Sequence, residues 1–201
     1  MLPLDTALAL VSFAFVTSIT PGPNNIMLTA SGVNFGFTRT IPHMLGIAAG
    51  FMALLLAVGF GLGAVFTLFP PLKAALKVAG AIYMLWLAWK IAHSGSGGDG
   101  GQPPGRPLTL WEAAAFQWVN PKAVVMALGA MAIYVRPDHL IGDVLLVTLV
   151  FGLVNLPSVS TWAAFGHVLR NALGDPAKLR FFNIAMALLL VLSILPMVST
   201  D

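Results

Sequence analysis

The sequence contains no cysteine and very little charge. Without cysteine, the 201-residue chain can form no disulfide and cannot carry out thiol-relay redox chemistry. Only 8% of its residues are charged, whereas 58% are hydrophobic and the mean hydropathy is +0.91. So few charges cannot cover the surface of a soluble domain. The composition therefore indicates an integral membrane protein.

Several further absences narrow the functions that the chain can have. No stretch of basic residues is dense enough to indicate nucleic-acid binding, and the net charge of +3 fits basic loops beside anionic lipid. The four histidines are dispersed, so no metal site is expected. The chain contains neither His-Glu-x-x-His nor Gly-x-Ser-x-Gly, and no acid is paired with a base. We therefore expect no metal, no cofactor and no enzymatic activity.

What the chain has instead is a series of long apolar segments. A helix needs about 20 residues to span a membrane, and we expect six spans in an all-α integral membrane protein. Their ranges are 4–33, 41–68, 72–92, 112–135, 140–166 and 179–198. The first contains Asp5, lacks a basic start and exceeds signal-peptide length, so we expect it to be retained. In the second, Gly46 and Gly50 form a small-xxx-small pair that predicts close helix packing.

A glycine-rich stretch, residues 94–108, divides the apolar segments into two sets of three. Its composition predicts a flexible linker between a first unit, residues 1–93, and a second unit, residues 109–201. Because each unit has an odd number of spans, the two units enter the membrane in opposite directions. The expected fold is therefore six transmembrane helices in two inverted three-helix repeats.

The basic residues predict the orientation of the chain. Loops on the side of the linker carry six lysines and arginines, and loops on the opposite side carry three. The six are Arg39, Lys90, Arg106, Arg170, Lys178 and Arg180, and the three are Lys73, Lys77 and Arg136. Because cytoplasmic loops are enriched in basic residues, we expect the linker in the cytoplasm and both termini outside.

Two apolar segments, the first and the fourth, are interrupted at matching places. Residues 20–25 read Thr-Pro-Gly-Pro-Asn-Asn, and residues 120–122 read Asn-Pro-Lys. In each, a good helix N-cap, Thr20 or Asn120, precedes a proline suited to the first helical position. Each therefore predicts that one half-helix ends and another begins. Broken helices at corresponding places in two halves indicate the substrate site of a transporter.

The first interruption combines features that expose backbone groups. Pro21 and Pro23 have no N–H to donate, and Gly22 lets the chain bend. Carbonyls before the break lose their helical partners, and protein groups or water must satisfy them inside a membrane. Asn24 and Asn25 bring two amides to the same place, which suits a polar ligand. The alternative is a proline kink whose asparagines bond to neighbouring helices.

The second interruption places a lysine inside a span. A lysine at the centre of a membrane helix costs about 2.5–3.5 kcal/mol on insertion scales, and such residues usually have a function. Alternatively, Lys122 extends to the cytoplasmic interface. Gln117 and Asn120 keep the surroundings polar in either case. A further break is expected at Asn155 and Pro157 in segment five, where it either lines the pathway or merely kinks the helix.

The two breaks together predict an amino-acid site. Half-helix N-termini present free amides and partial positive charge, which favour a carboxylate, and Lys122 could assist. Freed carbonyls and asparagine oxygens would accept hydrogen bonds from an ammonium group. The candidate substrate-binding residues are Thr20, Pro21, Gly22, Pro23, Asn24, Asn25, Gln117, Asn120, Pro121, Lys122 and Asn155. No carboxylate lies in the middle of a span, so no acid is available as a proton carrier.

These motifs resemble those of the LysE/RhtB family of amino-acid exporters. The resemblance includes residues 21–24 (Pro-Gly-Pro-Asn), residues 80–90 with their glycine, aromatic residues and terminal Lys90, and residues 120–122. It extends over essentially the whole chain, including the segment count and the linker. The Pro-Asn-Asn form and the third segment resemble members that export cysteine and O-acetylserine.

The resemblance implies efflux of amino acids or close derivatives across the bacterial inner membrane, driven by the proton motive force. The expected partners are an amino-acid substrate and the lipid bilayer, without nucleic acid, and a homodimer is compatible with these expectations. The alternatives are a metal-ion exporter or a thiol-redox protein of the same superfamily, and a membrane enzyme. Dispersed histidines argue against the first and the lack of cysteine against the second.

Overall fold

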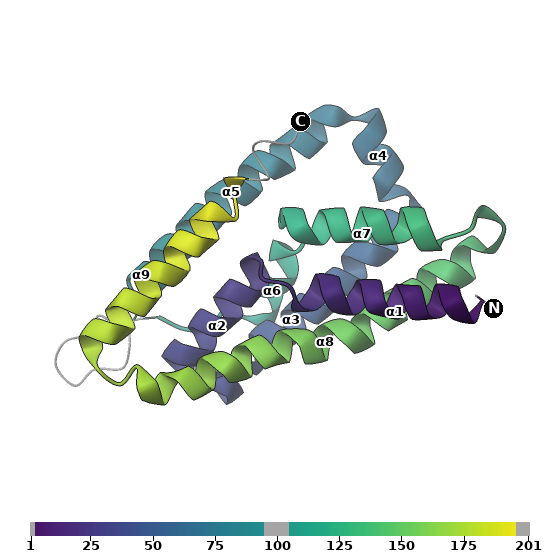
Figure 1. Ribbon diagram of the computed structural model, residues 1–201. Helices are drawn as coiled ribbons and strands as arrows, with labels where there is room; N and C mark the ends of the chain where they lie inside the picture. Colours follow the sequence, from purple (N-terminus) through teal and green to yellow (C-terminus); the bar gives the residue numbers. More distant parts are fainter. Residues whose placement is uncertain (1–2, 95–104, 196–201) are drawn as a thin grey trace.

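The computed structural model describes residues 3–94 and 105–195, and every regular element in these two ranges is a helix (Figure 1). Much of the predicted linker, residues 95–104, lies outside the described residues. The elements are α1 (Leu4–Ile19), α2 (Pro23–Phe35), α3 (Phe37–Ala57), η1 (Val58–Leu62), α4 (Gly63–Leu68), α5 (Pro70–Ala92), α6 (Leu110–Phe116), α7 (Pro121–Tyr134), η2 (Pro137–His139), α8 (Leu140–Ala172) and α9 (Pro176–Leu192).

Four of the expected spans have helices of sufficient length and hydropathy in the described part of the chain. Three are continuous or nearly so, over Phe37–Leu68, Ala74–Ala92 and Pro137–Ala172. The fourth is the pair α1 and α2, which is bent by 53° at the break. Segment four is divided into the short helices α6 and α7, and segment six forms α9 over 17 residues. The all-helical membrane fold is thus confirmed, and the count of six spans stays a prediction.

The break in the first segment is confirmed, but its cap differs from the predicted one. Thr20 is wrong as the N-cap of the second half-helix: it is the C-cap of α1, and its N–H donates to the carbonyl of Val16. Gly22 is the N-cap of α2, and Pro23 takes the first helical position, where its missing N–H costs nothing. Either Pro21 or Pro23 could take the first position of the second half-helix, and Pro23 takes it.

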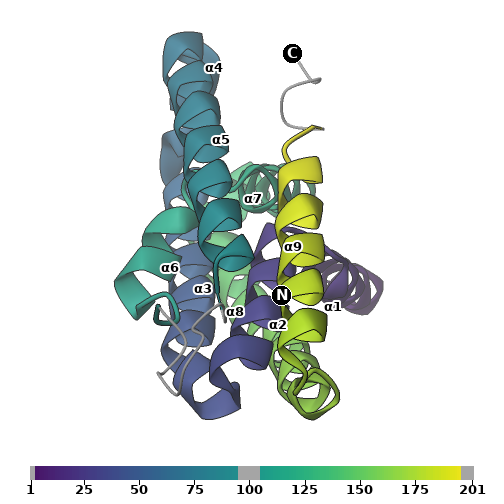
Figure 2. The same ribbon diagram turned by 90° about the vertical axis from the view of Figure 1, so that its left-hand side faces the viewer.

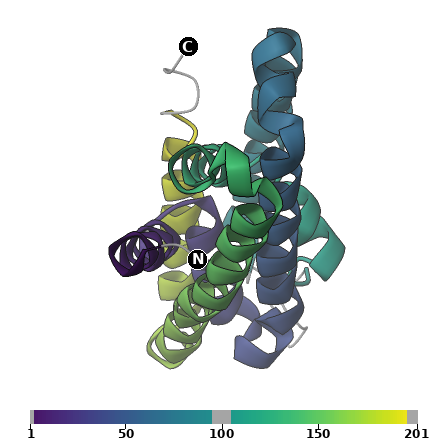
Figure 3. The same cartoon turned by 90° about the vertical axis from the view of Figure 1, so that its right-hand side faces the viewer.

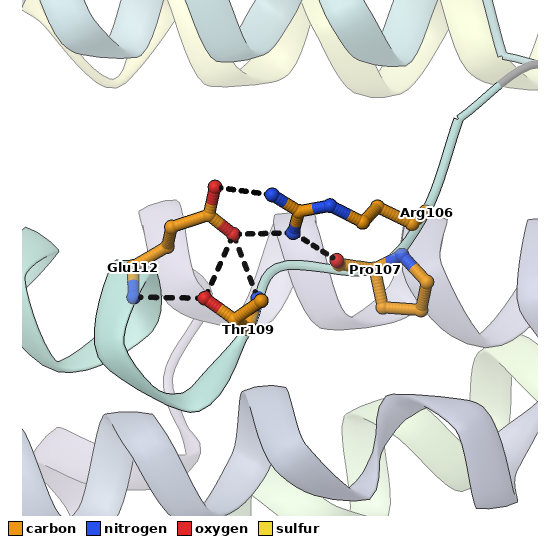
Figure 4. A network of polar contacts seen from close by, with 4 residues as sticks. All are labelled: Arg106, Pro107, Thr109 and Glu112. Carbon is orange, nitrogen blue, oxygen red and sulfur yellow. Dashed lines mark hydrogen bonds and ion pairs between the residues drawn. The ribbon is translucent and has the colours of Figure 1, made fainter.

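The break in the fourth segment has the predicted cap. Asn120 is the N-cap of α7, and its Oδ1 accepts a hydrogen bond from the N–H of Lys122 at 3.1 Å. Before it, α6 begins with a capping box between Thr109 and Glu112. Arg106 donates two hydrogen bonds to the Glu112 carboxylate, at 2.6 and 2.8 Å (Figure 4), and this bonding raises the pKa of Arg106. Both ends of the short α6 are therefore fixed by local contacts.

The predicted break in the fifth segment is wrong. α8 continues for 33 residues from Leu140 to Ala172 with Pro157 inside it. Proline removes one helical hydrogen bond, but α8 packs against α1, α2 and α3 along its length, and this burial offsets the loss. A break that the sequence analysis missed lies instead in the second segment. There Gly61 has φ of +123°, a conformation that favours glycine, and separates α3 from α4.

The helices of the two predicted units pack against each other instead of forming separate bundles. α3 of the first unit packs on α6 and α8 of the second, and α2 packs on α8. α5 and α9 lie side by side, as seen in Figure 2, and Figure 3 shows α8 crossing beside α3 from the opposite side. The predicted close packing at the glycine pair is confirmed, because a Cβ on Gly50 would lie 2.5 Å from Cα of Ala114 in α6.

A second glycine contact joins α2 to α8. A Cβ on Gly32 would collide with the carbonyl oxygen of Ala163, and a Cβ on Gly166 would collide with that of Thr29. Only glycine allows the two backbones to approach so closely. This contact fixes the position of α2, the helix that follows the first break.

Candidate functional site

A polar layer separates two apolar clusters in the interior. The first cluster lies around Met27, Met44 and Phe116 and contains Val159 of α8. The second lies around Leu10, Phe51 and Ala127 and contains Phe151 of α8. Asn155 of α8 lies one turn from Phe151 and one turn from Val159, and it is 5% exposed. Both helix breaks reach this same layer, so their polar groups meet where the apolar packing is interrupted.

A small cavity lies in the polar layer. Seven of the predicted site residues line it: Gly22, Asn24, Asn25, Gln117, Asn120, Lys122 and Asn155. The rest of its lining was missed by sequence reasoning and consists of Thr17, Ser18, Phe51, Ala123, Met126 and Val159. Thr20, Pro21, Pro23 and Pro121 are not among the lining residues. The missed residues carry no local signal, because they face the cavity only through the way α1, α3, α7 and α8 pack.

The cavity is smaller than any amino acid. Its volume is about 30 Å³, which is roughly the volume of one water molecule in the liquid. An amino acid therefore enters only if side chains or half-helices move. An apolar cluster lies on each side of the polar layer, and the contacts of Lys122 with Thr20 beside the cavity are exposed.

Protein side chains satisfy the carbonyls that the first break sets free. Nδ2 of Asn25 donates to the carbonyls of Ser18 at 3.0 Å and Thr20 at 2.8 Å. Nε1 of Trp162, from α8, donates to the carbonyl of Ile19 at 3.0 Å. The end of α1 is thus capped by side chains from two other helices.

Lys122 completes this set from the second break. Its Nζ donates to the carbonyl of Thr20 at 2.7 Å, to Oγ1 of Thr20 at 2.9 Å and to the carbonyl of Pro21 at 3.5 Å. Gly22 leaves the space for this contact, because a Cβ there would lie 2.7 Å from Cδ of Lys122. The lysine therefore joins the two breaks across 102 residues of sequence.

A pair of amides forms a second connection between the breaks. Nδ2 of Asn24 donates to Oε1 of Gln117 at 2.8 Å, and Nε2 of Gln117 donates back to Oδ1 of Asn24 at 3.2 Å. Gln117 also donates to the carbonyl of Ala113 at 2.9 Å and is fully buried. Separating α2 from α6 would break both hydrogen bonds of this pair and leave Oε1 of the buried Gln117 without its donor.

Two polar groups at the cavity are left for a ligand in the described part of the chain. Nδ2 of Asn155 donates to Oγ of Ser18 at 3.3 Å, but its Oδ1 is buried and has no partner there. The N-terminus of α2 has no side-chain cap, because its N-cap is Gly22. Its first amides and partial positive charge face the polar layer, which favours an anion.

A larger cavity of about 400 Å³ lies near the linker end of the molecule. It is bounded by residues of α2, α3 and α5 and by residues 105–108, and it is mostly apolar. His43 lines it, is 1% exposed, and neither of its ring nitrogens has a partner among the described residues. Within the described ranges no three His, Cys, Asp or Glu side chains lie close enough to hold a metal.

Comparison with known proteins places these features in a family. The model of the LysE type translocator family matches residues 15–195. The chain is 32% identical to the cysteine/O-acetylserine efflux protein of Escherichia coli K12, over 90% of this chain and 91% of that protein. The protein of the same description from Salmonella typhimurium is 31% identical with the same coverage. No solved structure matches the chain.

Proposed function

Because the chain belongs to the LysE type translocator family, we propose that it exports a small amino acid or a close derivative from the bacterial cytoplasm. The observation that carries this proposal is the polar cavity at the meeting point of two helix breaks. Secondary transporters build their substrate site from discontinuous helices in this way. The relatives are named as efflux proteins, which supports transport instead of catalysis.

The cavity and the exposed carbonyls of the first break beside it suit both charged groups of an amino acid. The uncapped N-terminus of α2 and the amide of Asn24 would hold the carboxylate. The carbonyls of Thr20 and Pro21 and the free Oδ1 of Asn155 would accept from the ammonium. We propose that the other predicted residues support these groups. Gly22, Pro23 and Pro121 shape the breaks, Asn25 and Asn120 cap them, and Gln117 holds Asn24. Lys122 bonds the carbonyls of Thr20 and Pro21 while no substrate is bound.

The size and polarity of the site suggest a small substrate side chain. Phe51, Met126 and Val159 supply apolar side chains to the lining of the cavity. A short side chain such as that of cysteine or O-acetylserine would contact these apolar residues. The relatives are named as efflux proteins for these two compounds. We further propose that the proton motive force drives export and leave a homodimer as a compatible assembly.

The inverted repeat is part of the same proposal. α3 and α8 are corresponding helices of the two units, and each packs tightly on a half-helix of the opposite unit. α3 packs on α6, the first half-helix of segment four, and α8 packs on α1, the first half-helix of segment one. This reciprocal arrangement supports two units of opposite direction around one central site.

Counterflow in proteoliposomes tests the function. Vesicles loaded with unlabelled L-cysteine, under reducing conditions, should take up labelled L-cysteine or O-acetyl-L-serine faster than protein-free vesicles. Because the chain has no cysteine, the label cannot attach to the protein through a disulfide. Asn24→Ala should lower apparent affinity about tenfold or more, since a lost hydrogen bond to a charged group costs about 1.5–3 kcal/mol.

The matched control for this variant is Asn171→Ala, which changes an exposed asparagine at the end of α8. It should leave counterflow unchanged. Absence of counterflow for every amino acid in a broad panel, with correctly folded protein, would remove the proposed function. Chemical conversion of the labelled compound would favour the membrane enzyme.

The proposed orientation has its own test. An introduced cysteine at Asn171, on the linker side, would be the sole thiol of the chain. It should resist an impermeant thiol reagent in intact cells and react after permeabilisation. Labelling in intact cells would reverse the topology.

A further inference from the structure

Lys122 places an ammonium group where the proposed site would hold the ammonium of its substrate. Its Nζ binds both oxygens of Thr20 and lies 3.5 Å from the carbonyl of Pro21. We propose that Lys122 is the proton carrier of the transporter and that its ammonium and the substrate's ammonium occupy these carbonyls in turn. The inference rests on the proposed function, because it assigns the coupling residue of that same site.

The two ammonium groups cannot share the site. The carbonyls of Thr20 and Pro21 and Oγ1 of Thr20 are already engaged by the ammonium of Lys122. A substrate ammonium that takes these oxygens must therefore displace the lysine. The displaced ammonium would then lie beside a second positive charge, and the repulsion between the two favours the neutral amine.

The surroundings of Lys122 offer no other charge. The groups that line the cavity from α1 are Thr17 and Ser18, and those from α2 are Gly22, Asn24 and Asn25. Those from α3 and α8 are Phe51, Asn155 and Val159, and those from the second break and α7 are Gln117, Asn120, Ala123 and Met126. Every one of these described groups is uncharged. No carboxylate there would hold the displaced lysine as a cation or would compete with it for the proton.

The proton balance of one cycle follows from this exchange. On the cytoplasmic side the substrate's ammonium takes the carbonyls, and Lys122 releases one proton to the cytoplasm. On the outer side the substrate leaves, the neutral amine of Lys122 takes one proton from outside, and its ammonium returns to Thr20. One substrate moves out and one proton moves in. For a zwitterionic substrate the cycle carries one positive charge inward.

Two assays on the same proteoliposomes separate coupling from transport. Counterflow requires only that loaded sites change sides, whereas accumulation of labelled L-cysteine against its gradient requires a pH gradient and a proton carrier. In Lys122→Met and Lys122→Gln we expect counterflow at a tenth or more of the wild-type rate. Accumulation driven by the pH gradient should fall to the level of protein-free vesicles. Lys122→Gln keeps a donor for Thr20 and covers the case in which the methionine variant does not fold.

The control variant is Lys178→Met, which changes an exposed lysine in the first turn of α9. It should retain both counterflow and driven accumulation. Gly22→Ala keeps the lysine but pushes a methyl group to 2.7 Å from its Cδ. This variant should lower driven accumulation more than counterflow.

The outcomes distinguish the proposals. If the wild type shows no counterflow, the proposed function fails, and the coupling proposal fails with it. If counterflow is normal in the wild type and Lys122→Gln still accumulates substrate on a pH gradient, Lys122 is not the carrier. If folded Lys122→Gln loses counterflow together with accumulation, the lysine is needed for binding, and the coupling role is likewise overturned.

Discussion

The two helix breaks satisfy their free backbone groups in different ways. At the second break, the turn between α6 and α7 makes its hydrogen bonds within its own residues. The amides of Gln117, Trp118 and Val119 donate to carbonyls three residues back, and Asn120 caps the new helix. At the first break, the carbonyls at the end of α1 are satisfied by side chains from α2, α7 and α8.

Under the proposed function, this difference indicates which break would change during transport. A turn whose hydrogen bonds are all local keeps them when neighbouring helices move, so the second break can keep its conformation. The first break loses its caps whenever α7 or α8 shifts relative to α1. Its conformation is therefore tied to the packing of the whole molecule, as a site that senses a ligand requires.

The largest effect is expected for Asn25→Ala. This change removes the donor to the buried carbonyl of Ser18 and one of the two donors to the carbonyl of Thr20, which Lys122 also bonds. An unsatisfied buried carbonyl costs about 1–3 kcal/mol and a second lost hydrogen bond about 1 kcal/mol, so the free energy of unfolding should fall by about 2–4 kcal/mol. Thermal unfolding in detergent measures the loss, with Asn171→Ala as the exposed control. A loss below about 0.5 kcal/mol would mean that water replaces the amide.

Gly166→Ala should have the next largest effect. The added Cβ meets the backbone of Thr29, which cannot turn aside as a side chain would, so α2 must shift on α8. Overpacking of this kind costs about 1–3 kcal/mol. Gly142→Ala is the matched control in the same helix, because a Cβ there meets nothing within 4 Å. If both variants unfold at the same temperature, the α2–α8 contact is looser than described.

The amide pair tests how strongly the breaks are connected. A double-mutant cycle with Asn24→Ala and Gln117→Ala should give an interaction free energy of about 0.5–3 kcal/mol, the range for residues in direct contact. The measurement is the unfolding free energy of the two single variants and the double variant. Additive losses would show that the two breaks respond independently.

The smallest effect is expected at the self-contained break. Asn120→Ala removes one N-cap and should cost about 1 kcal/mol, whereas Asn120→Ser keeps an accepting oxygen and should cost less. Unfolding in detergent again measures both. A loss for Asn120→Ala larger than that for Asn25→Ala would reverse the comparison between the breaks.

Local rules predicted the features that depend on neighbouring residues. Asn120 with Pro121 gave the second break correctly, and Gly46 with Gly50 gave close packing. The same rules failed where tertiary packing determines the helix ends. Gly22, not Thr20, is the N-cap of α2, and α8 continues through Pro157.

The partners of the site residues were beyond local rules altogether. Lys122 is hydrogen-bonded to Thr20, and Gln117 to Asn24, and each pair is separated by about half of the chain. No pattern in a single sequence specifies such pairs, because they exist only once the two units have packed. Sequence reasoning therefore named most of the polar groups at the cavity but could not say which of them bind one another.

The two apolar clusters on either side of the cavity would also shape the electric field across the membrane. A dry region carries most of the transmembrane voltage, and one elementary charge moved through 100 mV changes in energy by about 2.3 kcal/mol. If both clusters exclude water, the voltage is divided between them, with Lys122 in the layer between. When one cluster opens to water, the whole voltage falls across the other. Each opening would therefore place the proton on Lys122 at the potential of the side that it faces.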